Sequence, residues 1–284
     1  MFDTIIEIQE FFNLKKDTHT VVVDCRYDLN DKCAGRKSYI ESHIPGAVYA
    51  DVHDDLSGPP VTDHGRHPLP APDHLVGLFN RLGVCKNTQI VTYDNNGGAF
   101  ASRLWWLARY MHHDAVAVLD GGWQAWKKSG LPVSGGLEEQ SPGDFSGQAH
   151  HEWLVTVEGV PDVPLLVDSR DPVRYRGDEE TLDKAAGHIP GAINYFWKNN
   201  LDGEGYFRPP AELHAAFSRL LEDTLPADAV FYCGSGVTAC MNLLSAAHAG
   251  FPLPRLYAGS WSDWCSDPGR PVATGNEPGR LDRE

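Results

Sequence analysis

Short runs of β-branched and aliphatic residues alternate with longer stretches of helical pattern along the chain. Runs such as VVVD (21–24), QIVTYD (89–94) and AVFY (229–232) have the length and residue types of buried strands. Stretches such as RLWWLARYM and AELHAAFSRLLED instead repeat apolar residues at helical spacing. Because alternating strands and helices build parallel sheets, the pattern predicts an α/β fold. Helices would cover both faces of a mainly parallel sheet, and reactive groups would lie at the carboxyl ends of the strands.

The chain repeats itself. Four blocks recur in the same order: VVVDCR (21–26) as LLVDSR (165–170), HIPGA (43–47) letter for letter at 188–192, QIVTYDNNGG (89–98) as AVFYCGSGVT (229–238), and DGGWQAWKKSGLPV (120–133) as AGSWSDWCSDPGRPV (258–272). Matched blocks in one order indicate a duplicated domain. Between the copies lies a stretch rich in Gly, Ser and acids. We therefore expect one domain at 1–138, a linker at 139–152 and a second domain at 153–284.

Composition narrows the possible functions. The 284 residues are 42% hydrophobic and carry a formal net charge of −15. Such a charge repels nucleic acid and anionic membranes, so neither is expected as a partner. The N-terminal stretch has acids inside its apolar part, unlike a signal peptide, and no run of about 18 uncharged apolar residues occurs. A cytoplasmic protein is expected. The six cysteines form no Cys-x-x-Cys pair, which predicts reduced thiols and no metal site.

One cysteine stands at the start of a glycine-rich loop. Cys233 follows the strand AVFY and precedes the loop Gly234–Thr238, and a helical stretch begins after that loop. Gly234 and Gly236 permit positive φ, which lets successive N–H groups converge on one point and hold an anion. A helix N-terminus adds partial positive charge. The loop contains no basic residue, so main-chain donors are expected to stabilise the thiolate in place of a cation.

Two other interpretations of Cys233 are weighed against a nucleophile. The residue could be a small buried hydrophobic side chain at a strand end. A cysteine phosphatase would need an arginine six positions after the cysteine, where this chain has Ala239. The first copy has Asp94 where the second has Cys233. This difference is expected of a duplicated enzyme in which one copy has lost its catalytic residue.

These motifs carry a family resemblance. VDSR, the two HIPGA segments, the GGW and GSW blocks and CGSGVTA together resemble the tandem-rhodanese sulfurtransferases over nearly the whole chain. The resemblance implies two rhodanese-like α/β domains, of which only the second bears the cysteine. It also implies a ping-pong reaction without a cofactor. The thiolate takes sulfane sulfur from a small anionic donor, becomes a persulfide and passes the sulfur to cyanide, a thiol or thioredoxin.

The resemblance also assigns roles to residues. Cys233 would bear the persulfide, and Ser235 would cooperate with His67 of the HPLP segment. The resemblance also implies an acidic partner for His67, and its identity is left open. His53 stands at the matching position, with Asp51 and Asp54 on either side. Four loop residues would supply amide hydrogen bonds to the sulfur: Gly234, Gly236, Val237 and Thr238.

The donor is left open between two candidates. Arg174 matches an arginine that binds the carboxylate or sulfonate of the donor, for which a planar fork is well suited. A second arginine typical of mercaptopyruvate enzymes is not found, and Asp183 stands at its nearest match, as in many thiosulfate enzymes. Thiosulfate enzymes, however, usually have basic residues in the loop. The loop therefore favours 3-mercaptopyruvate over thiosulfate as the donor, and a persulfide carrier for one acceptor protein is a further alternative.

Several prominent residues are interpreted as structural. His43 and His188 precede Ile-Pro-Gly turns and are expected to fix the chain there. Cys240 is expected in the core, whereas Cys265 is placed in a loop where it could be oxidised. The tryptophans are expected to anchor packing: Trp105, Trp106, Trp123, Trp126, Trp261 and Trp264.

Overall fold

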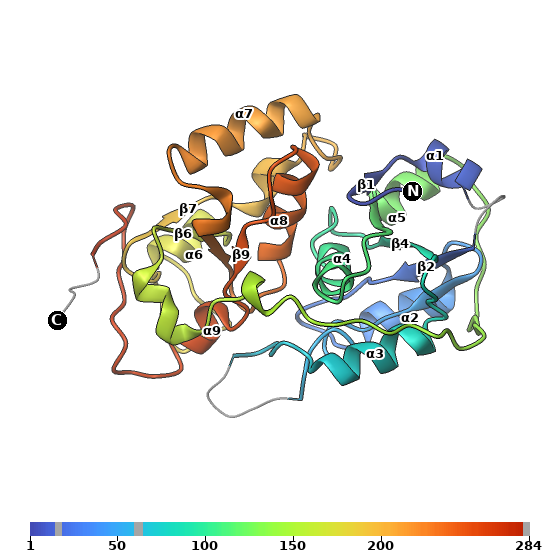
Figure 1. Ribbon diagram of the computed structural model, residues 1–284, viewed down its shortest axis with the longest axis horizontal. Helices are drawn as coiled ribbons and strands as arrows, with labels where there is room; N and C mark the ends of the chain where they lie inside the picture. Colours follow the sequence, from blue (N-terminus) through green and yellow to red (C-terminus); the bar gives the residue numbers. More distant parts are fainter. Residues whose placement is uncertain (15–18, 60–64, 281–284) are drawn as a thin grey trace. The chain divides into compact units, whose positions relative to one another are not determined.

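The computed structural model describes residues 1–14, 19–59 and 65–280, and the chain divides into two compact units (Figure 1). Unit 1 comprises Met1–Gly58, Pro70–His150 and Leu201–Phe207, and unit 2 comprises Pro59–Leu69, His151–Asn200 and Arg208–Glu284. Each unit thus contains one short segment from the other half of the sequence. The domain boundaries predicted from the sequence divide the chain into continuous stretches. They therefore do not include the two exchanged segments.

Unit 1 is a five-stranded sheet in the order β1-β5-β4-β2-β3, and every neighbouring pair is parallel. Its strands are β1 (Ile5–Ile6), β2 (Thr20–Asp24), β3 (Ala47–Tyr49), β4 (Gln89–Tyr93) and β5 (Val116–Leu119). The helices that flank it are α1 (Ile8–Leu14), α2 (Ala34–Glu41), α3 (Pro72–Arg81), α4 (Ala101–Tyr110) and α5 (Gly122–Lys128). The predicted parallel α/β fold is confirmed for this unit.

Unit 2 repeats the order with four strands, β7-β6-β8-β9, again all parallel. Its strands are β6 (Leu165–Asp168), β7 (Ala192–Asn194), β8 (Ala229–Tyr232) and β9 (Arg255–Leu256). Its helices are α6 (Pro172–Arg176), α7 (Pro210–Leu221), α8 (Ala239–His248) and α9 (Ser260–Trp264), with short 3-10 turns at His151–Trp153, Val157–Asp162, Trp197–Asn200 and Pro226–Asp228. The carboxyl ends of β6 and β8 are neighbours, because Asp168 pairs with Tyr232. Residues that follow these two strands therefore meet at one edge of the sheet.

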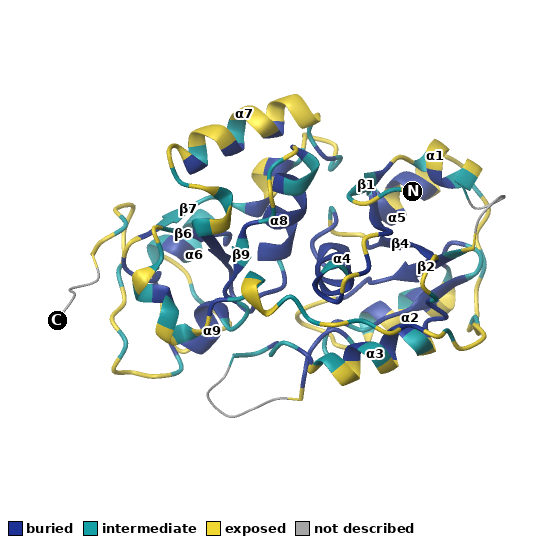
Figure 2. Ribbon diagram, viewed as in Figure 1, coloured by how far each residue is buried: buried dark blue, intermediate teal, exposed yellow. Residues whose placement is uncertain are grey.

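Each unit has its own apolar core, and the central strands of both are buried throughout (Figure 2). The six tryptophans expected as packing anchors are all at most 3% exposed. Parallel sheets covered on both faces need such continuous apolar strands. This explains why the strand runs show no apolar–polar alternation.

A buried ion pair is repeated at the same place in both units. In unit 2, the Arg170 guanidinium donates to both oxygens of Asp168 and to the carbonyl of Gly187, and it lies 4.7 Å from the Trp261 ring centre. Unit 1 repeats these contacts with Arg26, Asp24, Ser42 and Trp123. Although burial by itself lowers the pKa of Arg170, the Asp168 carboxylate outweighs it and holds that pKa above its ordinary value.

The two HIPGA histidines are fully buried, as a structural role requires. The Nδ1 atom of His43 is 2.7 Å from the Tyr39 carbonyl oxygen, and that of His188 is 2.8 Å from the Tyr175 carbonyl. Each imidazole also stacks on the ring of the same tyrosine. The histidines thus fix the turns that lead into β3 and β7.

In unit 1, burial disfavours the ionised form of one carboxyl group, that of Asp120. Asp120 follows β5 and accepts a hydrogen bond from the Phe207 N–H, and burial raises its pKa from 3.8 to about 6. The folded state therefore holds this proton more tightly than the unfolded state does, and stability is lost as the pH rises from 3.8 through about 6.

We predict that Asp120→Asn, which keeps the accepting oxygen, stabilises the protein above pH 6. The expected gain is on the order of 1 kcal/mol at pH 8, since solvent screens a partly exposed carboxylate. The gain should vanish near pH 4, where both side chains are neutral. Thermal unfolding of the two proteins across this pH range measures it, and a difference that does not change with pH would contradict the assignment.

Candidate active site

Cys233 begins the loop between β8 and α8 and is only 1% exposed. Its N–H donates to the Ser260 hydroxyl at 3.1 Å. The carbonyls of Cys233 and Gly234 accept hydrogen bonds from the N–H groups of Trp261 and Ser262. Both partners lie in α9, so the loop is fastened to that helix at its first two residues. Cys233 therefore lies at the carboxyl ends of the strands, as predicted from the sequence.

The matching loop of unit 1 shows how this turn holds an anion. Asp94 takes the place of the cysteine, and its carboxylate accepts hydrogen bonds from four backbone N–H groups at 2.7–2.9 Å: those of Asn96, Gly98, Phe100 and Ala101. Burial raises the pKa of Asp94, and these N–H donors oppose that effect. The loop of unit 1 thus directs four N–H donors at one carboxylate, which belongs to the protein itself.

His67 and Ser235 meet, as the sequence predicts. The His67 Nδ1 atom and the Ser235 Oγ atom share a hydrogen bond of 2.7 Å, and both residues are buried. His67 reaches the loop because its segment, Pro59–Leu69, belongs to unit 2. The acidic companion of His67 stays a prediction. Asp51, one of its candidates, accepts hydrogen bonds from the N–H groups of His53 and Asp54 in the turn after β3.

Two guanidinium groups lie beside the loop, although neither belongs to it. A Cβ atom built on Gly234 would lie 2.9 Å from Arg66 Nη2 and 3.4 Å from Arg174 Nη1. The side chains of Arg66 and Arg174 are 29% and 23% exposed. Two cations thus flank the residue that follows Cys233, although the loop itself contains no basic residue. Stabilisation of the thiolate by main-chain donors stays a prediction.

Arg174 was predicted from the sequence and Arg66 was not. The sequence contains one signal for Arg66, since it immediately precedes His67. If His67 reaches Ser235, its neighbour in the chain must also come near the loop. The Arg66 N–H donates to the Ser262 hydroxyl at 3.1 Å, which fixes its backbone against α9.

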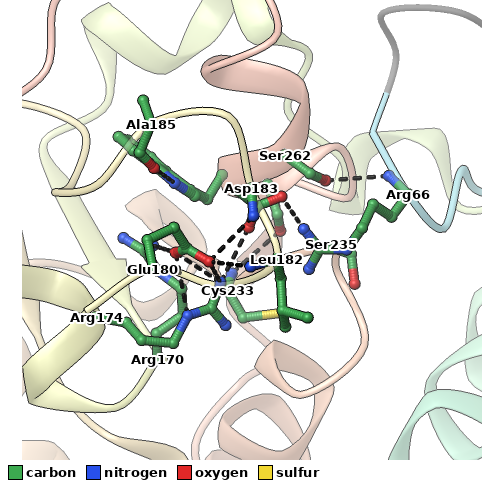
Figure 3. Close-up of polar contacts among 12 residues, drawn as sticks. Arg66, Arg170, Arg174, Glu180, Leu182, Asp183, Ala185, Cys233, Ser235 and Ser262 are labelled. Carbon is green, nitrogen blue, oxygen red and sulfur yellow. Dashed lines mark hydrogen bonds and ion pairs between the residues drawn. The ribbon is translucent and has the colours of Figure 1, made fainter. Parts of the chain in front are cut away.

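Both arginines are paired with buried acids (Figure 3). Arg174 donates to both oxygens of Glu180 and to Asp183, at 2.8–3.1 Å, and Arg66 forms an ion pair with the other oxygen of Asp183. Burial and the neighbouring charge of Arg174 lower the pKa of Arg66. A cavity of about 200 Å³ borders the Arg66–Asp183 pair and is lined also by Ser262 and Ser266. Small solutes can approach the pair from this side.

The other predicted residues occupy the rest of the loop. Gly236 adopts φ of 76°, as expected for the cradle, whereas Gly234 does not have positive φ, so that part of the expectation is wrong. Val237 and Thr238 lead into α8, where their carbonyls accept N–H groups of the first turn. Their role as amide donors to the sulfur stays a prediction. Cys240 is fully buried, as expected. Cys265 was expected in an open loop, which is wrong, because it is 8% exposed at the end of α9 and packs in the core.

The described residues contain no group of three or more potential metal ligands. Nor does any helix among them have the length and apolar character needed to span a bilayer.

A family model for the rhodanese-like domain matches residues 7–129 and 152–267. The chain belongs to the rhodanese family. Each rhodanese-like domain corresponds to one copy of the repeat, and both share the predicted α/β fold.

Relatives of known name align with both rhodanese-like domains. The chain is 48% identical over 266 residues to a probable 3-mercaptopyruvate sulfurtransferase of Pseudomonas aeruginosa, covering 90% of this chain and 93% of that protein. It is 36% identical over 264 residues to SseB of Mycobacterium tuberculosis, a putative thiosulfate sulfurtransferase, covering 89% and 90%. The solved 3-mercaptopyruvate sulfurtransferase from Leishmania major superposes with a TM-score of 0.81 at 30% identity, covering 92% of this chain and 73% of that one.

The cradle depends on a glycine at one position. Gly236 combines a φ of 76° with a site for Cβ that collides with the Ala258 carbonyl oxygen, whereas Gly250, with φ of 87°, has open space around it. We predict that Gly236→Ala costs about 3 kcal/mol of unfolding free energy, from backbone strain and the clash together. Gly250→Ala, the matched control, should cost only about 1 kcal/mol from backbone strain. Denaturant unfolding measures both, and equal costs would show that the close approach to Ala258 is unimportant.

Proposed function

We propose that this protein is a sulfurtransferase that moves sulfur from a small anionic donor through a persulfide on Cys233. One observation carries this proposal: a cysteine at the start of a glycine-containing loop between a strand and a helix has two guanidinium groups beside the adjacent Gly234. The thiol provides the nucleophile. Arg66 and Arg174 provide a site for an anionic group of the donor a few ångströms away. The relatives named as sulfurtransferases support this reaction class.

The reaction takes place in two displacement steps. In the first, the Cys233 thiolate attacks the donor sulfur, and a new S–S bond forms. With 3-mercaptopyruvate the C–S bond breaks, the electron pair leaves with the carbon, and the proton of the donor thiol ends on that carbon to give pyruvate. With thiosulfate the S–S bond of the donor breaks and sulfite leaves. In the second step, cyanide or a thiolate attacks the outer sulfur, and the Cys233 thiolate is regenerated as the leaving group.

The His67–Ser235 pair is suited to handle the proton of the first step. Its two side chains share a short hydrogen bond, and Ser235 lies two residues after the nucleophile in the same loop. Imidazole is the side chain that most readily takes up and returns a proton near neutral pH. We assign to this pair the transfer of the donor's thiol proton to the departing carbon.

We favour 3-mercaptopyruvate as the donor and keep thiosulfate as the alternative. The active loop carries no basic residue of its own, and the site presents arginine forks, which match the planar geometry of a carboxylate. The relative with 48% identity is named as a probable 3-mercaptopyruvate enzyme, and the relative with 36% identity as a putative thiosulfate enzyme. A thiol such as that of thioredoxin, or cyanide, would accept the sulfur.

A second candidate function is a persulfide carrier that passes sulfur to one acceptor protein. The burial of Cys233, at 1% exposure, favours it, because a shielded persulfide would resist small acceptors. Kinetics separate the two functions. A persulfide that forms stoichiometrically but reaches cyanide and small thiols only slowly would support the carrier.

We predict that Cys233→Ser reduces thiocyanate formation to background with either donor, since a serine hydroxyl does not form the persulfide. The assay supplies 3-mercaptopyruvate or thiosulfate as donor and cyanide as acceptor. The matched control is Cys33→Ser, which removes an exposed thiol and should leave turnover unchanged. Turnover that persists in the Cys233 variant would exclude the proposed mechanism.

Removal of Arg174 should weaken donor binding more than it slows the chemistry. Loss of a charge-assisted contact to the donor's anionic group corresponds to a rise in KM of about 10- to 100-fold for Arg174→Ala. Because this contact exists both in the bound donor and in the transition state, kcat should change less than KM. Steady-state kinetics with both donors test this, and wild-type KM values in the variant would remove Arg174 from the donor site.

A further inference from the structure

The catalytic copy contains a segment that its partner copy lacks. The pair Tyr175 and His188, whose rings stack, is 13 residues apart, whereas the matching pair Tyr39 and His43 in unit 1 is 4 residues apart. The difference is nine residues and corresponds to 178–186, which we call the acidic insertion. It reads DEETLDKAA and contains the carboxylates that pair with the arginines. The copy that keeps the cysteine is thus the copy that carries these acids.

The acidic insertion has a defined conformation. One oxygen of Glu180 accepts hydrogen bonds from the N–H groups of Leu182 and Asp183, at 2.8 and 3.1 Å, and closes a turn (Figure 3). The Trp261 indole donates to the Ala185 carbonyl at 3.0 Å. The side chains of Glu180 and Asp183 are each 3% exposed. The position of the Asp183 carboxylate is therefore fixed by its own turn and by α9.

Asp183 stands between two like charges. One of its carboxylate oxygens contacts Arg66 and the other lies 3.0 Å from Arg174 Nη2. Without an anion between them, the two guanidinium groups would repel each other. Burial is the larger cause of the lowered pKa of Arg66, and the charge of Arg174 is the second. Arg66 Nη2 and Arg174 Nη1, which do not contact Asp183, lie 2.9 and 3.4 Å from the position of a Cβ atom on Gly234, and Arg174 Nη2 lies 3.7 Å from it. Asp183 therefore contacts one terminal nitrogen of each guanidinium group, and the other terminal nitrogen of each lies beside the loop.

We propose that Asp183 is a positioning residue that holds Arg66 and Arg174 together as one two-pronged site for the carboxylate or other anionic group of the sulfur donor. The proposal rests on the proposed function and adds the residue that shapes its donor site. Asp183 does not touch the donor. It acts through the two arginines, and Glu180 fixes it in place. Asp183 thereby recruits Arg66 as the second cation of the site.

Two alkylating reagents test this without any sulfur transfer. Iodoacetate and iodoacetamide both alkylate a thiolate, forming a C–S bond as iodide leaves, but only iodoacetate carries a carboxylate. At Cys233, the alkylation rate with iodoacetate is divided by the rate with iodoacetamide. This ratio is then divided by the same ratio at the exposed Cys33. The resulting normalised ratio measures how well the site attracts a carboxylate. Peptide mass spectrometry reads both sites in one sample. In Asp183→Asn the two arginines are no longer held together, so the carboxylate of iodoacetate should lose one charge-assisted contact and the normalised ratio should fall about tenfold.

Three further variants complete the design. Arg66→Gln should lower the ratio as Asp183→Asn does, whereas Asp183→Glu, which keeps the charge, should retain most of it. Glu179→Gln is the matched control, because it removes an exposed acid from the same segment and should leave the ratio unchanged. Circular dichroism confirms that each variant is folded. If Asp183→Asn does not fold, the comparison of Asp183→Glu with Glu180→Gln takes its place, and Glu180→Gln should lower the ratio.

The outcomes separate this proposal from the proposed function. A ratio that is unchanged or higher in folded Asp183→Asn would overturn the role of Asp183, since the acid would then be a bystander or a competitor of the donor. In kinetic assays, the proposal predicts a higher KM for the donor with a smaller change in kcat. If Asp183→Asn lowers the normalised ratio but the wild-type protein transfers no sulfur, the result would support the anion site and contradict the sulfurtransferase function.

Discussion

A row of alternating charges, buried except for two partly exposed arginines, connects the sheet of unit 2 to the loop that carries Cys233. The row runs from Asp168 at the end of β6 through Arg170, Glu180, Arg174 and Asp183 to Arg66, with each charge next to one of opposite sign. Charges removed from water are stable only when they are paired. Each member of the row is therefore fixed by its neighbours, and Arg66 and Arg174 reach the loop in defined positions. The chemistry of the site depends on this constraint.

The duplication provides an internal comparison. Both copies keep the Asp–Arg–Trp contacts and the stacked histidine that build the fold. They differ in the residues near the loop. The turn Gly65-Arg66-His67 of the first half corresponds to Gly205-Tyr206-Phe207 of the second, and both glycines have positive φ. The first turn belongs to unit 2, near Cys233, and the second belongs to unit 1, where the Phe207 ring lies against Gly98 of the Asp94 loop. Unit 1 thus has an aspartate, a tyrosine and a phenylalanine at the places where unit 2 has the nucleophile, the cation and the imidazole.

The sequence was sufficient for the fold and for part of the site. Strand runs, the repeat and the strand–loop–helix around Cys233 are local patterns, and the resemblance supplied His67, Ser235 and Arg174. The place of Arg66 could not be predicted from local pattern, since it follows from a segment of the first half that joins unit 2. The acidic insertion resembles a solvated loop in sequence, because Asp183 pairs not only with nearby Arg174 but also with Arg66, which comes from the first half of the chain. Cys265 was misplaced for a similar reason, since its burial depends on tertiary packing.

Intact-protein mass spectrometry tests most directly whether Cys233 takes sulfur from an anionic donor. The protein is incubated with 3-mercaptopyruvate or thiosulfate in the absence of an acceptor, and the modified peptide is then identified. The predicted result is the gain of one sulfur atom per chain on the peptide that contains Cys233, lost again when cyanide is added. An unchanged mass with both donors, or a sulfur atom found only on another cysteine, would contradict the central claim.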